Sequence, residues 1–492
     1  MNLESLCHEL LLDVYLFLST VHLFRAFRGL DARFNTLIFN HVRTYGHFDF
    51  RSASKQDCDI IYQQHLPTII DQIISLRLSN DDNTPQQIER FLSRGFIFCH
   101  FIQLQLLSLF SMYSPETMMQ MIDDLRHLPN LDHLNSVDCY LGESRLRYSL
   151  ETLMNLLQNM PNILHLTIET AYIDLNGYRF EPIITNYLPK LKVLQLKMCI
   201  ALDNITNKEQ QIDNLINSCR SSFCLDKHQW FVRCHLDFTS QSNIIWIYTL
   251  SYAFSNFNVI SDNILIRSTC PQESDFYSYD CVNRFSCKST IILECMLSHI
   301  KFPNIHHLIL EYCPNPYFWS IIPTLDQLVS LEIFLCDESN KTIQDQLQNR
   351  LCRAPHLTSL KFRSWSILSA FLYEIKNQSI RRLDLQGTDR LYRELWLNGD
   401  ECIQSGPSTL GIQCEVLFIR VKHRESMLNR VNLMNNIRVL NFFCQDNQLD
   451  ESDGLSLARH DELVTWFEDQ LSLAWEIAKH PRYFRCIQMW IR

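Results

Sequence analysis

The chain has 492 residues, of which 46% are hydrophobic, 20% are charged and only 10 are glycine. This composition is typical of a globular protein with an extensive core and excludes low-complexity and disordered classes. The formal net charge is −10, and Lys and Arg are scattered rather than clustered, which argues against nucleic acid as the main partner. No stretch reaches the roughly eighteen apolar residues that a membrane span requires, so no membrane partner is expected.

The first forty residues carry more apolar side chains than a surface segment should. One set recurs at helical spacing and comprises Leu6, Leu10, Val14 and Leu18, with Leu11, Phe17 and Val21 beside them. After Ser19-Thr20 a second helical set comprises Leu23, Phe24, Phe27, Leu30, Phe34, Leu37 and Ile38. Two or three short helices are predicted. A domain of about forty residues rarely buries enough surface to fold alone, so this segment is expected to dock on something.

Residues 3–42 also follow a recognisable order, which is Leu, two variable residues, Glu, Leu, Leu, three more residues, an aromatic or apolar pair and Leu, followed by a Leu-rich second helix. This order resembles the F-box of ubiquitin-ligase substrate receptors. The chain departs from the family pattern with Leu6-Cys7 for Leu-Pro, Leu30-Asp31 for Val-Cys and Phe34 for Trp. The resemblance implies that the Skp adaptor of a cullin-RING ligase is contacted by Leu6, Glu9, Leu10, Leu11, Leu18, Leu23, Leu30 and Phe34.

The same segment has an alternative interpretation as a helical cap that shields the first unit of a larger fold, since repeat proteins require terminal caps. A secretion signal fits less well. The first dozen residues contain no Lys or Arg, and Asp13 interrupts the apolar run.

From Asp71 onward one short sequence pattern, here called the phrase, recurs along the chain. It consists of an apolar residue, two variable residues, Leu, one variable residue and a further apolar residue. Five copies begin with Pro, at Pro129, Pro161, Pro189, Pro303 and Pro355. Five more keep the apolar frame without Pro, over residues 73–78, 328–333, 380–385, 414–419 and 437–442. Where copies follow one another directly, they start 23 to 34 residues apart. Four extend to a Cys, at Cys139, Cys199, Cys313 and Cys336.

This phrase resembles the leucine-rich repeat in its Cys-bearing form. A strand over each phrase would turn the second and third apolar residues toward the core and the residue between them outward. Helices are predicted before the strands, over Pro115 to Leu125, with Ser114 as its cap, and over Ser149 to Gln158. One strand plus one helix per repeat, stacked, predicts a curved solenoid with a parallel sheet on its concave face.

The expected fold class is therefore α/β, and the chain is expected to divide into the following domains. A short F-box-like helical domain covers 1–45, and an irregular leucine-rich-repeat solenoid covers 46–445. Between residues 200 and 300 the phrase fades, although Trp230 to Phe238 and Asn258 to Arg267 still predict strands, with a loop over Cys270 to Cys287. An acidic loop follows at 446–460, and 461–492 forms a closing helix, Asp461 to Lys479, and a strand from Arg485.

The sequence contains 19 Cys, an odd number in a large chain without a visible leader, which favours a reducing compartment. The repeat cysteines are expected to pack inward as small apolar residues. No Cys-x-x-Cys pair indicates zinc, and no P-loop, Gly-x-Ser-x-Gly or His-Glu-x-x-His motif is present. The sequence therefore predicts no catalytic residues, no bound metal and no cofactor.

The outward residues of the strands are the candidate recognition surface, because exposed aromatics and Arg tend to anchor protein partners. The substrate-binding candidates are His165, Glu169, Gln195, Lys197, His307, Glu311, Phe334, Lys361, Arg363, Arg382, Asp384 and Phe443. The combined hypothesis is a cytoplasmic or nuclear, non-catalytic substrate receptor that docks on the Skp adaptor and holds an unidentified protein substrate. The alternatives are a freestanding leucine-rich-repeat scaffold or inhibitor, and an enzyme that uses one of the cysteines.

Overall fold

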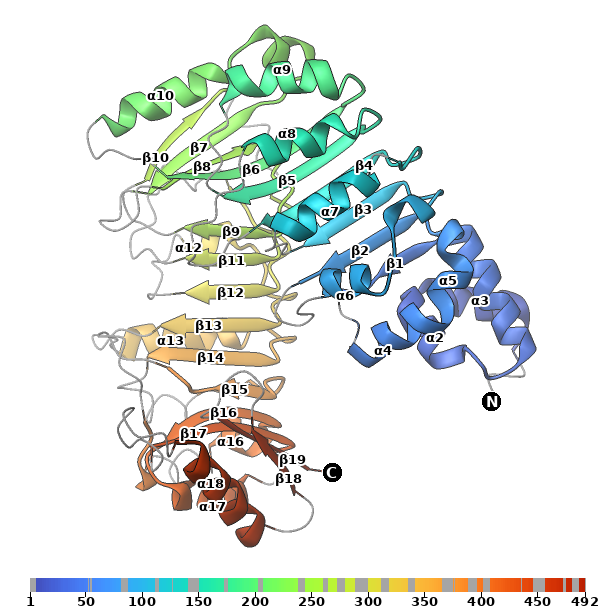
Figure 1. Cartoon of the computed structure of the whole chain (residues 1–492). Helices are drawn as coiled ribbons and strands as arrows, with labels where there is room; N and C mark the ends of the chain where they lie inside the picture. Colours follow the sequence, from blue (N-terminus) through green and yellow to red (C-terminus); the bar gives the residue numbers. More distant parts are fainter. Residues whose placement is uncertain are drawn as a thin grey trace. The chain divides into compact units, whose positions relative to one another are not determined.

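The computed structural model spans the whole chain. It describes all residues except 1–5, 52, 54, 81–86, 111–114, 126, 140–149, 172–175, 202–206, 238–243, 260–263, 272–278, 288–299, 311–317, 335–340, 365–374, 376, 388–395, 401–407, 435, 446–455, 472–474, 480–485 and 492. The chain divides into two compact units. Unit 1 comprises Met1–Leu250 and Asn263–Phe276, and unit 2 comprises Ser251–Asp262 and Tyr277–Arg492 (Figure 1).

Three helices open unit 1, namely α1 (His8–Leu16), α2 (Thr20–Phe27) and α3 (Ala32–Tyr45). Ser19 and Asp31 cap α2 and α3 by accepting hydrogen bonds from backbone N–H groups of the first turn. Helix α3 ends at Gly46, whose φ of 51° lies in the left-handed region. A Cβ at this position would lie 2.7 Å from the carbonyl oxygen of Gln72, so both the backbone angle and the available space require glycine.

A nine-stranded sheet follows, in the order β1-β2-β3-β4-β5-β6-β8-β7-β10. Its strands are β1 (His47–Asp49), β2 (Ser75–Ser79), β3 (Leu106–Phe110), β4 (His133–Cys139), β5 (His165–Ala171), β6 (Val193–Ala201), β7 (Val232–Asp237), β8 (Ile244–Thr249) and β10 (Ile264–Ser268). Strands β1 to β6 pair in parallel and in chain order. Strands β8, β7 and β10 extend the sheet in antiparallel pairs.

Helices alternate with the strands of unit 1 and lie along one face of the sheet (Figure 1). They are α4 (Lys55–Ile60), a π-helix (Ile61–His65), α5 (Leu66–Ile69), a 3-10 turn (Ile70–Gln72), α6 (Gln87–Ser93), a 3-10 turn (Phe98–His100), α7 (Pro115–Leu125), α8 (Leu150–Gln158), α9 (Gly177–Tyr187), α10 (Lys208–Ser218) and a π-helix (Phe223–Lys227). The core lies between the two layers, where Leu166 and Ile168 of β5 join one buried cluster with Leu157 of α8 and Phe180 of α9. The alternate residues of each strand therefore occupy the opposite face of the sheet.

Unit 2 contains a ten-stranded sheet in the order β18-β19-β17-β16-β15-β14-β13-β12-β11-β9. Its strands are β9 (Asn256–Val259), β11 (Arg284–Cys287), β12 (His307–Leu310), β13 (Ser330–Phe334), β14 (Ser359–Ser364), β15 (Arg382–Asp384), β16 (Val416–Val421), β17 (Val439–Cys444), β18 (Trp475–Lys479) and β19 (Cys486–Ile491). Pairing is parallel from β9 to β17 and antiparallel for β17, β19 and β18. The helices are α12 (Phe318–Ile321), α13 (Lys341–Leu351), α16 (Thr409–Gln413), α17 (Arg424–Leu433) and α18 (Ser456–Gln470).

The mixed α/β class with largely parallel sheets is confirmed, and neither sheet closes into a barrel through its described strands. All ten predicted phrases contain strands, and α7 and α8 occupy the predicted helical segments. The proposed cap Ser114 lies outside the described residues. Three further strands carry the same apolar frame and were not predicted as copies of the phrase. The frames are Leu104, Leu107 and Leu109 at β3, Phe254, Phe257 and Val259 at β9, and Val282, Phe285 and Cys287 at β11, all buried.

The central region differs from the prediction of one parallel sheet. Strand β8, which was not predicted, inserts between β6 and β7 in antiparallel pairs. The predicted strand Asn258 to Arg267 is two strands in different sheets, β9 and β10, and the predicted loop to Cys287 ends in strand β11. Between 200 and 300 the chain thus leaves one sheet and begins another, so 46–445 is split between the two units.

The closing helix was also predicted with wrong bounds. Helix α18 begins at Ser456, inside the predicted acidic loop, and ends at Gln470. Trp475 and Ala478 continue the helical spacing in sequence but lie in strand β18, which pairs with β19 next to β17. Pairing to the sheet edge overrides the local pattern, because an uncovered edge leaves backbone groups without partners.

Among the described residues, no helix has both the length and the apolar character needed to cross a membrane.

Candidate functional site

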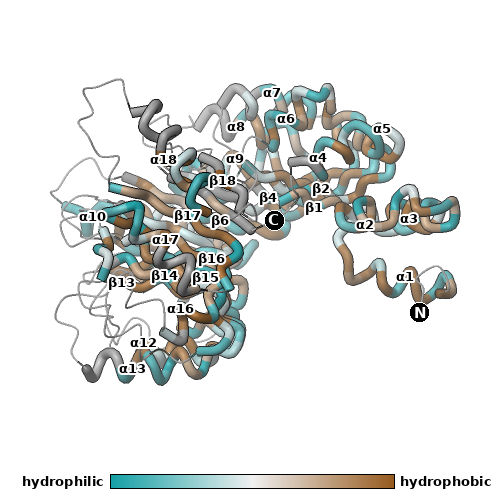
Figure 2. The backbone as a smooth tube through the Cα atoms, turned by 90° about the horizontal axis from the view of Figure 1, so that it is seen from below, coloured by the Kyte–Doolittle hydropathy of each residue, from teal (hydrophilic) through white to brown (hydrophobic). Residues whose placement is uncertain are grey.

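Helix α1 presents apolar side chains to solvent, and hydrophobic residues recur along its backbone (Figure 2). Leu10 is 50% exposed and Phe17, at the C-cap, is 89% exposed. Residues three and four apart share a side of a helix, so Leu10, Val14 and Phe17 lie together, with the exposed Cys7 one turn before Leu10. We call these four residues the α1 face. Further exposed apolar residues nearby in the sequence are Leu12, Leu16 and Leu30.

The eight residues predicted to contact an adaptor divide by burial. Leu11, Leu23 and Phe34 are completely buried, so the expectation that they touch a partner directly is wrong for this structure. Leu6 and Leu18 are partly buried against the same core, whereas Glu9, Leu10 and Leu30 are exposed. The most exposed member of the face, Phe17, was not among the predicted contacts. Its position one helical turn after Val14 is the signal that could have found it.

The buried side of α1 fixes its orientation. Helix α1 packs against α3, and the Tyr15 ring meets His41 edge to face at 5.8 Å between centroids. A guanidinium N–H of Arg33 donates to the carbonyl oxygen of Leu6. Hydrogen bonds from its own backbone N–H and from the Cys7 side chain lower the pKa of Glu9 at the helix start. The exposed side is thus held in place without contributing to that packing.

The strand face of unit 1, opposite its helices, carries four predicted substrate-binding residues on β5 and β6. Thr167 pairs with Gln195 and Glu169 pairs with Lys197 in register. The Thr167 hydroxyl donates to the Gln195 side-chain oxygen at 2.7 Å. The His165 ring stacks on His133 at 4.1 Å between centroids. Burial lowers the pKa of His165, and the neighbouring His133 lowers it further.

Glu169 and Lys197 were expected to be exposed, and this expectation is wrong. They are 4% and 5% exposed and form an ion pair with 2.5 Å between Nζ and Oε1. The Lys197 ammonium also lies 5.5 Å from the centre of the Trp246 ring on β8. Cys199 is the next residue on this face. It was predicted to pack in the main core, but it packs against Trp246 instead. Glu169 and Lys197 therefore belong to a buried, internally paired part of the face and not to an exposed surface.

The strand face of unit 2 carries a charged ladder. Glu332, Lys361 and Asp384 occupy one row on β13, β14 and β15. The Lys361 ammonium lies 3.5 Å from Glu332 Oε1 and 3.7 Å from Asp384 Oδ2, and Arg363 donates to Glu332 as well. Burial raises the pKa of Asp384 despite the nearby Lys361. The two carboxylates on this face are therefore neutralised within the protein.

Arginines and aromatic rings stack beside this ladder. The exposed Arg382 guanidinium lies 4.5 Å from the centre of the Phe418 ring, and that of Arg420 lies 5.3 Å from the Phe443 ring. Phe334 is half-buried at the end of β13, and Glu311 lies outside the described residues. His307 lies on the exposed face of β12, where partial desolvation of its ring and the neighbouring Arg284 lower its pKa. The unit 2 candidates that the structure describes thus share one face of the sheet.

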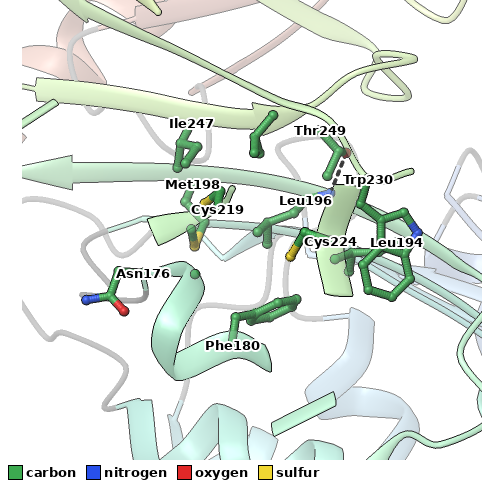
Figure 3. Close-up of a pocket in the computed structure, with 12 residues that line it drawn as sticks. Asn176, Phe180, Leu194, Leu196, Met198, Cys219, Cys224, Trp230, Ile247 and Thr249 are labelled. Atoms are coloured by element: carbon green, nitrogen blue, oxygen red, sulfur yellow. Dashed lines mark hydrogen bonds between the residues drawn. The ribbon is translucent and has the colours of Figure 1, made fainter. Parts of the chain in front are cut away.

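A small cavity lies on the helix side of the unit 1 sheet, near the start of α9 (Figure 3). Its volume is about 40 Å³, and its lining includes Phe180, Leu196, Trp230 and Ile247. The Thr249 hydroxyl at its edge already accepts a hydrogen bond from the Leu196 backbone N–H at 3.0 Å. The cavity therefore offers apolar contact and little polar chemistry.

Buried thiols in this structure are poor nucleophiles. Burial raises the pKa of Cys58 and Cys219 to about 11, and that of Cys199 and Cys234 to about 12. Among the described residues, no group of three or more His, Cys, Asp or Glu side chains is placed to hold a metal ion.

A scan against protein-family models finds no match to this chain, and a search of curated proteins finds none either.

Proposed function

We propose that this chain is a non-catalytic substrate-recognition subunit of an SCF-type E3 ubiquitin ligase. Its N-terminal helices would act as an F-box that docks on the Skp adaptor, and the remainder would be a leucine-rich-repeat solenoid that binds a protein substrate. The observation that carries the proposal is the α1 face, where a helix held by Leu11 and Tyr15 leaves Leu10 and Phe17 in solvent. Adjacent exposed apolar residues of this kind are typical of a partner site.

The strand arrangement supports the repeat part of the proposal. Strands of one apolar frame pair in parallel and in chain order from β1 to β6 and again from β11 to β17. Among the described residues, a helix lies between each successive pair of strands from β1 to β6 and again in the β12–β13, β13–β14, β15–β16 and β16–β17 connections, as in solenoids built from strand-helix repeats. The strand face then supplies the substrate surface.

Such a receptor needs no reactive residue. Holding a substrate beside a ubiquitin-charged enzyme raises the effective concentration of substrate lysines, and this proximity accelerates transfer. The 13 described free cysteines fit the reducing cytoplasm or nucleus where these ligases work.

A freestanding repeat scaffold, capped by its N-terminal helices, is the second candidate. The observation that favours it is the packing of α2, where Phe24 contacts Phe48 of β1 at 6.1 Å and stacks on His65 at 4.8 Å between ring centroids. Helix α2 therefore shields the first strand in either case. The two candidates differ at α1, since a cap gives no role to the exposed Leu10 and Phe17.

The test is co-purification of the full chain with the Skp adaptor. Deleting residues 1–42 would uncover the core around Phe48, so point variants are preferable. Leu10→Asp and Phe17→Asp should each abolish capture, because each would bury an unpaired charge in the interface. Ile412→Asp is the matched control, since Ile412 is 53% exposed on α16 of unit 2. Failure of the folded wild-type chain to bind would favour the capped scaffold.

A further inference from the structure

The described part of the strand face of unit 2 is basic, although the whole chain has a formal charge of −10. Among the described outward residues of β11 to β17, five basic side chains face two carboxylates. The basic residues are Arg284, Lys361, Arg363, Arg382 and Arg420, and the carboxylates are Glu332 and Asp384. Lys361 and Arg363 already neutralise the two carboxylates, so the remaining charge on the face is positive.

Two of the arginines can pair their charge with a carboxylate of a bound partner. Arg284 and Arg382 are exposed, and neither side chain has a hydrogen bond or ion pair with any residue that the structure describes. Their described charged neighbours act only from a distance, Arg284 on His307 and Arg382 on Asp384. Phe418 supports the Arg382 guanidinium from one side at 4.5 Å. Stacking on a ring leaves the N–H edges of a guanidinium free to donate, which is the geometry that binds carboxylates.

The two arginines occupy the same row of the sheet. Arg284 pairs with His307, His307 with Ser330, Ser330 with Ser359, and Ser359 with Arg382. Four steps between neighbouring strands, at about 4.8 Å each, separate them by roughly 19 Å. An extended peptide advances about 3.3 Å per residue, so roughly six residues span the distance.

We propose that this face binds an extended peptide segment in which two Asp or Glu carboxylates about six residues apart pair with Arg284 and Arg382. The row between them holds His307, which is exposed beside Arg284, and then Ser330 and Ser359, small polar residues that leave room for a backbone to lie across the strands. This inference rests on the proposed function only in treating the peptide as a segment of the substrate.

The test is fluorescence anisotropy of the full chain with labelled peptides of about twelve residues, uncharged except for two Asp six positions apart. Tight binding that falls about tenfold or more in Arg284→Gln and in Arg382→Gln is expected, since hydrogen bonds to charged groups carry that much free energy. Arg353→Gln, which changes an exposed arginine next to α13, should leave binding unchanged. Thermal unfolding of each variant checks that it is folded.

Three control peptides sharpen the result. Replacing both Asp by Asn, or placing them two positions apart, should weaken binding to wild type. Binding that is indifferent to Arg382→Gln, or equal for the Asn peptide, would overturn the proposal. So would a peptide with two phosphoserines that binds while the Asp peptide does not, because the face would then read phosphate. Adaptor capture of the same proteins separates this failure from failure of the ligase function.

Discussion

Leu10 and Leu11 are neighbours in α1, yet Leu10 is half exposed and Leu11 is completely buried. Leu11→Ala should lower the free energy of unfolding of unit 1 by about 2–5 kcal/mol, because it leaves a cavity among packed helices. Leu10→Ala should change it by no more than about 0.5 kcal/mol. Urea unfolding followed by circular dichroism measures both, and equal losses would mean that α1 is turned differently.

The buried pair Glu169 and Lys197 gives a second prediction. Glu169→Gln should destabilise unit 1 by about 3–5 kcal/mol, because it leaves the Lys197 ammonium without its counter-charge in the interior. The double change Glu169→Leu with Lys197→Met should recover most of that loss, since apolar residues of similar size avoid the desolvation cost. Calorimetric unfolding decides the point, and a single variant as stable as wild type would place the pair in solvent.

Acid should weaken unit 1. Burial, with Lys197 and Arg233 nearby, lowers the pKa of His235 from 6.5 to about 3. The unfolded chain therefore binds more protons than the folded chain between about pH 6.5 and 3, and the free energy of unfolding falls as the pH falls through that window. Burial also lowers the pKa of His41, His47 and His65 in the same direction.

The measurement is unfolding of wild type and His235→Gln across pH 7 to 4. The variant lacks one proton-binding group of the unfolded state, so its stability should fall less steeply with acid. Identical slopes for the two proteins would show that His235 titrates normally in the fold.

Gly46 joins α3 to the first strand, and its replacement should be costly. Gly46→Ala forces a Cβ to within 2.7 Å of the Gln72 carbonyl oxygen and strains a positive φ. A loss of about 1–3 kcal/mol is expected. Gly95→Ala is the control, because Gly95 also has a positive φ but nothing lies within 4 Å of the added carbon. An equal loss in both variants would assign the whole effect to backbone strain.

The sequence was most informative where structure is local. The apolar frame of each phrase records strand alternation directly, so ten strands and the helices α7 and α8 could be predicted. Aromatic and Cys substitutions hid the same frame at Phe257 and Phe285. Strand order carries no local signal, and the antiparallel insertion of β8 between β6 and β7 therefore could not be predicted.

The candidate sites show the same division. Alternation placed Glu169 and Lys197 on the correct sheet face, but their burial depends on what packs over them, which a strand pattern does not contain. Likewise α1 is apolar on more than one side, so the pattern alone could not decide that Leu11 faces the core and Leu10 the solvent. Burial is a tertiary property, and the structure was needed to supply it.

The rate of Cys7 alkylation, with and without the Skp adaptor, tests the central claim most directly. Cys7 is exposed on the α1 face, and the exposed Cys352 in unit 2 provides an internal control in the same sample. Mass spectrometry should show that saturating adaptor slows labelling of Cys7 and leaves Cys352 unchanged. Equal labelling of Cys7 in the free and adaptor-treated protein would contradict docking through the α1 face.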